Sequence, residues 1–200
     1  TTPDESWETI GLIIYSGAGP ANPALRHAFN MSAPVEITGL RLLTPAGAAI
    51  DELEIYADPL IVIPPPPEAL EITPGEGFEI TWDGNDGDHF DPTPPEDGAK
   101  VPDNLALAAN GAEPFASDEF GDIHLIENIN DGFYGNANSW IDGGANPAFS
   151  GVRFGSSVEM NRIAWGRDNG NGEWDDSDVG TDRCGGQCDD RDSGVYTLQF

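Results

Sequence analysis

The sequence ends inside a strand pattern. Residues Gly194–Phe200 alternate apolar and polar side chains, and no turn residue follows them. The first residues, Thr1–Trp7, have the composition of a turn followed by the start of a strand. A strand cut at its end has unpaired backbone amides and carbonyls that need a partner. We therefore expect the last and first segments to be neighbours in one sheet, formed within this chain, with its continuation or with a neighbouring copy.

Short apolar segments separated by Gly, Pro, Asn and Asp recur along the chain. This pattern is typical of antiparallel sheet, and no amphipathic helix of normal length is present. The segments predict an all-β fold, most simply a β-sandwich. In the segment 50–56 the alternation of apolar and polar residues shifts at Glu52–Leu53, which indicates a bulge or a special site. The predicted strands are 7–15, 25–29, 35–43, 50–56, 149–154, 158–165 and 195–200.

The middle of the chain has a different composition. Pro64–Pro67 predicts a stiff polyproline II spacer, and 83–98 is acidic and rich in turn residues. A short hairpin is predicted between them, with strands at 70–72 and 78–82. We therefore divide the chain into a first half (1–57), a linker (58–104) and a second half (105–200).

The chain is strongly acidic, with 36 Asp and Glu against 8 Lys and Arg and a formal charge of −28. Nucleic acids and anionic lipid surfaces would repel it, and no apolar run reaches membrane-spanning length. Bound divalent cations would reduce the self-repulsion. Cys184 and Cys188 flank Gly-Gly-Gln, and a disulfide between them would suit an oxidising, extracellular compartment.

Several motifs, taken together, resemble a discoidin domain (factor V/VIII type C, galactose-binding-like). Those similar to the opening part of such a domain lie in the second half, and those similar to its closing strands lie in the first half. The resemblance implies a jelly-roll sandwich, often with one structural calcium ion, whose two halves occur here in permuted order. The opening motifs are Asn130–Trp140, Phe149–Gly155, Asn161–Asp168 and Tyr196–Phe200, and the closing ones are Ile37–Leu43 and Ala49–Tyr56.

Three arrangements accommodate this order. Each sandwich could combine halves from successive units of a tandem array, separate chains could exchange halves and polymerise head to tail, or both halves could meet in one permuted monomer. A head-to-tail contact that does not close produces a filament. We expect a repeating fibre in preference to the monomer, because Phe200 and Thr1 read as a cut through a continuous chain.

The resemblance also implies a calcium site. The site would be made from the turn Asn130–Gly132 and Glu52 of a closing strand. Its ligands would be Asp131 and Glu52, with Asn136 and Ser139 nearby. Calcium binds six to eight oxygen ligands, which these side chains and backbone carbonyls provide. The alternative is an ordinary Asp-Gly turn and a solvated Glu.

Two further acidic segments are weaker calcium candidates. Asp83, Asn85 and Asp88 alternate with glycine and other turn residues, but the segment lacks the closing Glu of an EF-hand loop. The segment 168–178 is rich in Asp, and solvated acidic loops explain both segments equally well.

Carbohydrate binding is the common activity of the family. The residues of suitable type are Trp174, Arg167, Arg191, His124 and Tyr134, whereas those that read as core residues are Trp7, Trp140 and Trp165. No carboxylate pair or His-based motif stands out, so we expect no enzyme activity. The sequence thus predicts a secreted or cell-surface structural subunit that binds calcium and identical copies of itself, with a carbohydrate-binding module that recognises glycans as the alternative.

Overall fold

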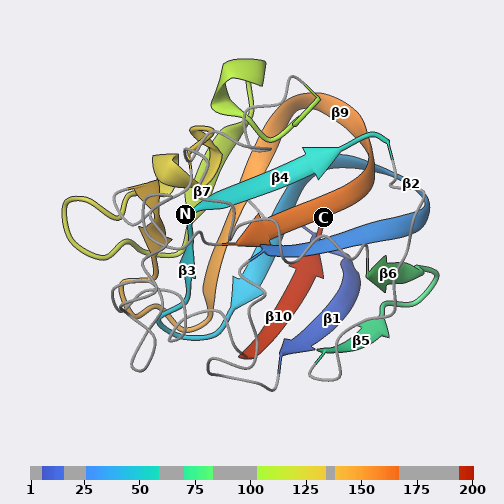
Figure 1. Ribbon diagram of the computed structural model, residues 1–200, viewed down its shortest axis with the longest axis horizontal. Coiled ribbons are helices and arrows are strands. Elements are labelled where there is room, and N and C mark those ends of the chain that lie inside the picture. The colour runs from blue at the N-terminus through green and yellow to red at the C-terminus, as the bar shows by residue number, and fades with distance from the viewer. Residues whose placement is uncertain (1–5, 16–25, 59–69, 83–102, 134–137, 167–193) are drawn as a thin grey trace, which may run out of the picture.

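Two long antiparallel strands dominate the fold. β2 (Arg26–Thr44) and β9 (Ala148–Gly166) have 19 residues each and curve alongside one another (Figure 1). The structure is a computed structural model that describes residues 6–15, 26–58, 70–82, 103–133, 138–166 and 194–200. The sequence pattern predicted two shorter strands in place of each long one, with breaks at 30–34 and at 155–157. Register irregularities lie there, but the strands continue through them.

All the strand pairs are antiparallel, which confirms the all-β sandwich. One sheet contains eight strands, and a two-stranded sheet joins β3 to β8. The 3-10 helices η2 (Ala108–Asn110) and η3 (Ile126–Asn130) are the described helices, and neither is long enough to cross a membrane. The remaining strands are β1 (Thr9–Tyr15), β3 (Ala49–Ile50), β4 (Glu52–Tyr56), β5 (Leu70–Pro74), β6 (Ile80–Trp82), β7 (Glu113–Ala116), β8 (Trp140–Ile141) and β10 (Gly194–Gln199).

The curvature of β2 and β9 divides the large sheet into two layers. In the first layer, the start of β2 pairs with the end of β9, and β4 and β6 pair on their outer sides. In the second layer, the end of β2 pairs with the start of β9, flanked by β7 on one side and by β10, β1 and β5 on the other. Each long strand therefore belongs to both layers.

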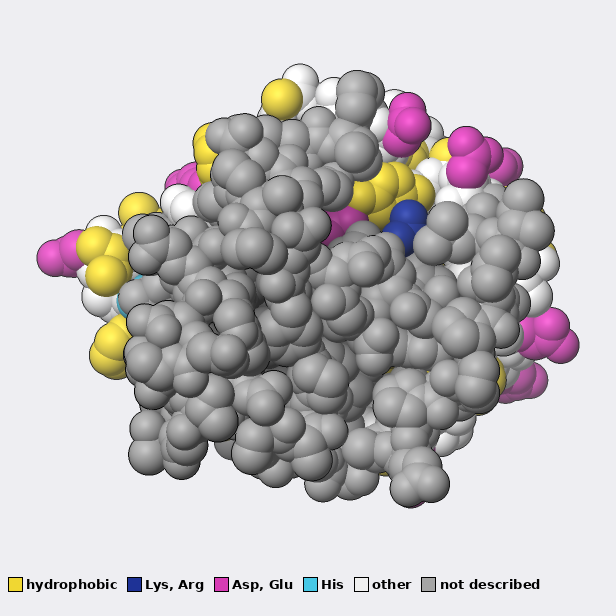
Figure 2. All heavy atoms as spheres, viewed as in Figure 1, with side chains coloured by type: hydrophobic (Ala, Val, Ile, Leu, Met, Phe, Trp, Pro, Cys, Tyr) yellow, Lys and Arg dark blue, Asp and Glu magenta, His cyan; other side chains and the backbone are white. Residues whose placement is uncertain are grey.

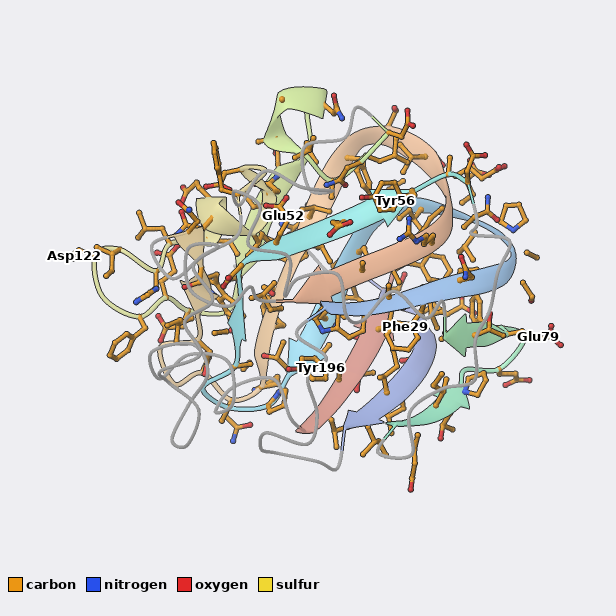
Figure 3. All side chains as sticks on the ribbon, viewed as in Figure 1. Phe29, Glu52, Tyr56, Glu79, Asp122 and Tyr196 are labelled. Atoms are coloured by element: carbon orange, nitrogen blue, oxygen red, sulfur yellow. The ribbon has the colours of Figure 1, made fainter. Side chains whose placement is uncertain are left out.

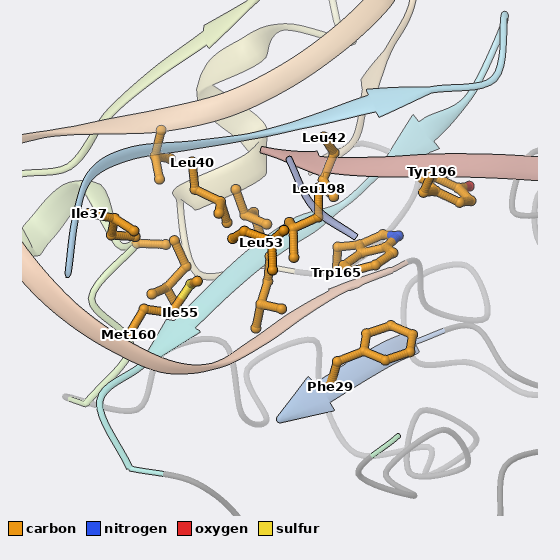
Figure 4. Close-up of a cluster of buried hydrophobic side chains, with 14 of the residues drawn as sticks. Phe29, Ile37, Leu40, Leu42, Leu53, Ile55, Met160, Trp165, Tyr196 and Leu198 are labelled. Atoms are coloured by element: carbon orange, nitrogen blue, oxygen red, sulfur yellow. The ribbon is translucent and has the colours of Figure 1, made fainter. Parts of the chain in front are cut away.

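The core lies between these layers. Leu53 and Ile55 of β4 point into it, as do Trp165 of β9 and Leu198 of β10 (Figure 4). Burying one such large apolar side chain contributes roughly 1.5–3 kcal/mol, so these side chains together provide the main driving force for the two layers to pack. Trp140 and Trp165 are fully buried, as predicted. Trp7, which was also predicted to be a core residue, is only partly buried.

The two halves of the chain meet within one sandwich. β1 pairs with β10, and Glu8 and Phe200 exchange backbone hydrogen bonds of 2.9 and 3.0 Å. Residues 70–82, which were predicted to form a hairpin within the linker, contain β5 and β6. These strands pair with β1 and β2, respectively, and not with each other. The sandwich is therefore completed by a half-module from the same chain.

Candidate functional site

The outward face of β4 is unusual because it is both acidic and buried. Leu53 and Ile55 point into the core, so the alternation of a strand places Glu52, Glu54 and Tyr56 on the opposite face (Figure 3). All five residues of β4 are nevertheless buried. A buried carboxylate is stable only if it is protonated, paired or bound to a cation.

A second segment approaches this face from far along the sequence. Helix η3 ends at Asn130, whose amide Nδ2 donates to the carbonyl oxygens of Ala106 and Ala112 at 3.0 and 3.2 Å. Asp131 follows, and its Oδ1 accepts a hydrogen bond of 2.8 Å from the Phe133 amide. The turn closes at Gly132, whose φ of 86° is accessible to glycine at little cost.

Glu52 is where these two segments meet. The Gly132 amide donates to Glu52 Oε2 at 3.0 Å, across 80 positions of sequence. Burial, followed by the charges of Glu54, Asp131 and Asp51, raises the pKa of the Glu52 carboxyl well above its usual value, and the Gly132 hydrogen bond offsets only part of this. The site therefore has more negative charge than its described neighbours neutralise.

Two buried oxygen atoms of the site lack a hydrogen-bond partner among the described residues. They are Glu52 Oε1 and Asn130 Oδ1. The buried carboxylate of Asp142 differs, because its oxygens accept from the amides of Gly47, Gly144 and Ala145 at 3.1–3.2 Å. Asp142 thus has the donors that a buried carboxylate requires, whereas Glu52 has one.

The donor set of this site fits calcium. Carboxylate and amide oxygens are the hard ligands that Ca²⁺ prefers, and Glu52, Asp131 and Asn130 supply them. Within the described ranges, no three His, Cys, Asp or Glu side chains converge in a metal-binding geometry. A calcium ion here would therefore need amide and backbone carbonyl oxygens in addition to the two carboxylates.

The neighbouring Glu54 has a different environment. Tyr56 donates its hydroxyl to Glu54 Oε2 at 2.5 Å, and the Arg162 guanidinium lies 4.7 Å from the centre of the Tyr56 ring. Arg162 is the cross-strand partner of Tyr56. This carboxylate therefore has a strong hydrogen-bond donor, Tyr56, whose ring lies beside a cation, and this distinguishes Glu54 from Glu52.

The structure brings together Glu52 and Asp131, the two residues that the resemblance paired. Ser139 is also buried, but its hydroxyl lies 3.0 Å from His124 Nδ1, and its carbonyl oxygen accepts from Asn128 Nδ2 at 2.9 Å. The other candidates lie outside the described residues: Asn136, Asp83, Asn85, Asp88, the acidic segment 168–178, Trp174, Arg167, Arg191, Tyr134, Cys184 and Cys188.

Sequence reasoning did not identify Glu54 as a neighbour of the site. A signal for Glu54 exists, since residues i and i+2 of a strand share a face and Glu52 had already been singled out. Asn130 was part of the predicted site, as the residue that precedes the Asp-Gly turn.

Comparisons with known proteins do not assign the chain to a family. No protein-family model matches it. No curated protein and no solved structure gives a match either.

Proposed function

We propose that the chain is a secreted, calcium-stabilised and discoidin-like structural module, without catalytic activity, that repeats in an extracellular filament, stalk or surface layer. The observation that supports this best is the environment of Glu52. A fully buried carboxylate with one unpartnered oxygen lies beside Asp131 in a chain of charge −28. A divalent cation would neutralise this charge and bind the free oxygens.

Calcium at this position would join two parts of the chain. Glu52 belongs to β4 at the edge of the first layer, and Asp131 belongs to the turn after η3. When bound, the ion would supply electrostatic attraction between them without any reaction. Its effect would therefore be on the stability of the folded state, as expected of a structural site.

The connection between the two halves is compatible with assembly. Residues 83–102 link β6 to the second half, and 20 residues span at most roughly 70 Å when extended. A second half can therefore pair with its own first half or with that of a neighbour. If copies exchange their second halves, the strand pairs β2–β9 and β1–β10, which close the sandwich within one chain, form between two chains instead. An exchange that continues from copy to copy gives a filament.

The charge of the chain supports calcium-dependent assembly. At −28, copies repel one another in the absence of counterions. Calcium would lower this repulsion and stabilise each sandwich at the same time. Filaments with a large remaining charge would not bundle non-specifically.

The test compares thermal unfolding in EDTA, magnesium and calcium, followed by circular dichroism, for the wild type, Glu52→Gln and Asp131→Asn. Calcium at about 100 times its dissociation constant adds about 2.7 kcal/mol, which raises the melting temperature by roughly 5–10 °C for a domain of this size. Glu52→Gln should lose most of this increase. A wild type that melts at the same temperature in EDTA and in calcium would refute the calcium site.

Assembly is tested separately by electron microscopy of the wild type in calcium and in EDTA. Filaments in calcium that dissociate in EDTA are expected. Denaturing mass spectrometry then identifies the unit: a species near 21.3 kDa indicates separate subunits, and a ladder indicates covalent repeats. Glycan-array binding without any assembly would support the carbohydrate-binding alternative instead.

A further inference from the structure

The exposed apolar surface of the described residues is concentrated in one loop. Four large apolar side chains are exposed, and three of them, Phe120 (57%), Ile123 (64%) and Leu125 (36%), lie in residues 118–125. We call this segment the 118–125 loop. It projects from one end of the molecule, where Figure 2 shows apolar side chains beside acidic ones and Figure 3 labels Asp122. Apolar surface gathered in this way is typical of a contact site.

The 118–125 loop is held firmly by the rest of the fold. The Phe120 amide donates to the Ile141 carbonyl at 3.0 Å, and Trp140 Nε1 donates to the Asp118 carbonyl at 2.8 Å. Asn128 Nδ2 donates to the Ile123 carbonyl at 3.0 Å. A partner that binds this loop would therefore lose little conformational entropy in ordering it.

The charges around the loop define its partner. Asp118, Glu119 and Asp122 are all exposed beside Phe120 and Ile123, and the segment contains no Lys or Arg. A complementary surface must offer apolar contact together with positive charge. An anionic lipid or a nucleic acid would be repelled.

Such a surface exists on the chain itself. On the outer face of the second layer, the Arg41 guanidinium lies 4.4 Å from the Trp7 ring centre and 5.4 Å from that of Phe149. The Arg153 guanidinium lies 3.8 Å from the centre of the Phe115 ring. We call these five residues the arginine–aromatic array. It contains two of the three arginines whose side chains are described, in a protein with only 8 cationic residues.

The edges of the sheet offer less scope for contact between copies. Pro114 lies in the edge strand β7 and Pro74 ends the edge strand β5. At the edge of β4, the side chain of Asn104 already accepts from the Ile55 amide at 3.0 Å. Each of these features hinders the addition of a strand from another molecule. At these three edges, contact through side chains is therefore favoured over the addition of a strand.

We propose that the 118–125 loop of one copy docks on the arginine–aromatic array of another copy. This inference rests on the proposed function, since it names a contact by which copies assemble. Phe120 and Ile123 would pack against the rings, and the carboxylates beside them would pair with Arg41 and Arg153. A one-way contact would extend a filament, whereas a reciprocal contact would close a two-fold dimer.

Sedimentation velocity over a range of concentrations, at fixed ionic strength and in calcium, tests this contact. The wild type should self-associate, and the double variant Phe120→Ser, Ile123→Ser should raise the dissociation constant at least about tenfold. Val195→Ser is the matched control, because Val195 is equally apolar and 47% exposed but lies on β10. Association unchanged in the double variant, or equally weakened in the control, would overturn the inference.

Variants with reversed charges provide a second test of the contact. Arg153→Glu should weaken association, and mixing it with Asp122→Arg should restore association between the two variants, because each supplies the other's lost charge pair. Failure of the mixture to associate, with both proteins folded by circular dichroism, would contradict the contact. Electron micrographs separate this inference from the proposed function. If the loop variants form filaments as the wild type does, the contact between the loop and the array is refuted but the filament is not. If the wild type associates through this contact without forming filaments, the filament is refuted but the contact is not.

Discussion

Glu8 and Phe200 lie opposite each other just beyond the paired ends of β1 and β10, and each donates its backbone amide to the carbonyl oxygen of the other, at 2.9 and 3.0 Å. The pair extends the register of β1 and β10, in which Thr9 faces Gln199. The two segments that the sequence analysis expected to be neighbours are therefore joined in one sheet.

This pairing predicts that the chain tolerates circular permutation. If Phe200 is joined to Thr1 and the chain is opened between Trp82 and Asp103, residues 1–7 become the connection between β10 and β1. Loop-closure entropy changes slowly with length, so the permuted protein should fold with a stability within about 1 kcal/mol of the wild type. Urea unfolding followed by tryptophan fluorescence measures this. An unfolded permuted chain would contradict the pairing.

The burial of the Glu52 carboxyl predicts that the stability of the protein depends on pH in the absence of divalent cations. Because burial raises the pKa of its carboxyl in the folded state, the stability that Glu52 contributes is fully present below the ordinary carboxyl pKa and is lost as the pH rises through the raised value. In EDTA at neutral pH, Glu52→Gln should therefore be more stable than the wild type, and the difference should shrink as the pH falls.

Adding calcium should reverse this order, since the wild type gains binding energy that the variant lacks. Glu79→Gln is the control, because Glu79 is exposed just before β6 and should show neither effect (Figure 3). Urea unfolding from about pH 5 to about pH 8 gives the comparison. A variant less stable than the wild type in EDTA at neutral pH would contradict the account.

Gly151 is predicted to tolerate no side chain. A Cβ atom there would lie 2.1 Å from the Leu40 carbonyl oxygen and 2.8 Å from Arg41 Cα. Gly151→Ala should therefore destabilise the fold by about 1–3 kcal/mol. In the same strand, a Cβ on Gly155 would meet nothing within 4 Å, so Gly155→Ala should change stability by less than about 0.5 kcal/mol. Equal effects of the two variants, measured by urea unfolding, would refute this packing.

Asn104 is predicted to be important for the edge of β4. Its Oδ1 accepts from the amides of Ile55 and Ala106, both at 3.0 Å. Asn104→Ala should cost about 2 kcal/mol or more, because both buried amides lose their acceptor. Asn110→Ala, at an exposed residue that donates one hydrogen bond to the Asn104 carbonyl, should cost less than about 1 kcal/mol. Thermal unfolding of the two variants should rank them in this order.

Most strands were predictable because their apolar residues alternate between turn residues. The short strands β7 and β8 were not predicted. The lengths of β2 and β9 were not predictable either, since Asn30–Pro34 and Gly155–Ser157 have the composition of turns but lie within continuous strands. Local composition does not distinguish a turn from an irregularity at which a strand bends. In 50–56 the predicted offset at Glu52–Leu53 lies one residue after the observed break between β3 and β4 at Asp51.

Contacts between distant segments were harder to predict. The proximity of Glu52 to the turn at Asp131 and Gly132 followed from the resemblance, because no periodicity links Glu52 to Gly132, 80 positions away. The arginine–aromatic array had no signal at all in the sequence. Trp7, Arg41 and Phe115 come from three separate segments, and only the register of the strands brings them together.

The passage of β2 and β9 through both layers has a mechanical consequence. Neither layer can detach from the other by sliding or hinging, because two unbroken backbones would have to be pulled out of register at once. Hydrogen exchange of the most protected amides in the two layers should therefore occur through a single opening event, and a pulling force applied to either long strand would be shared by the whole sandwich.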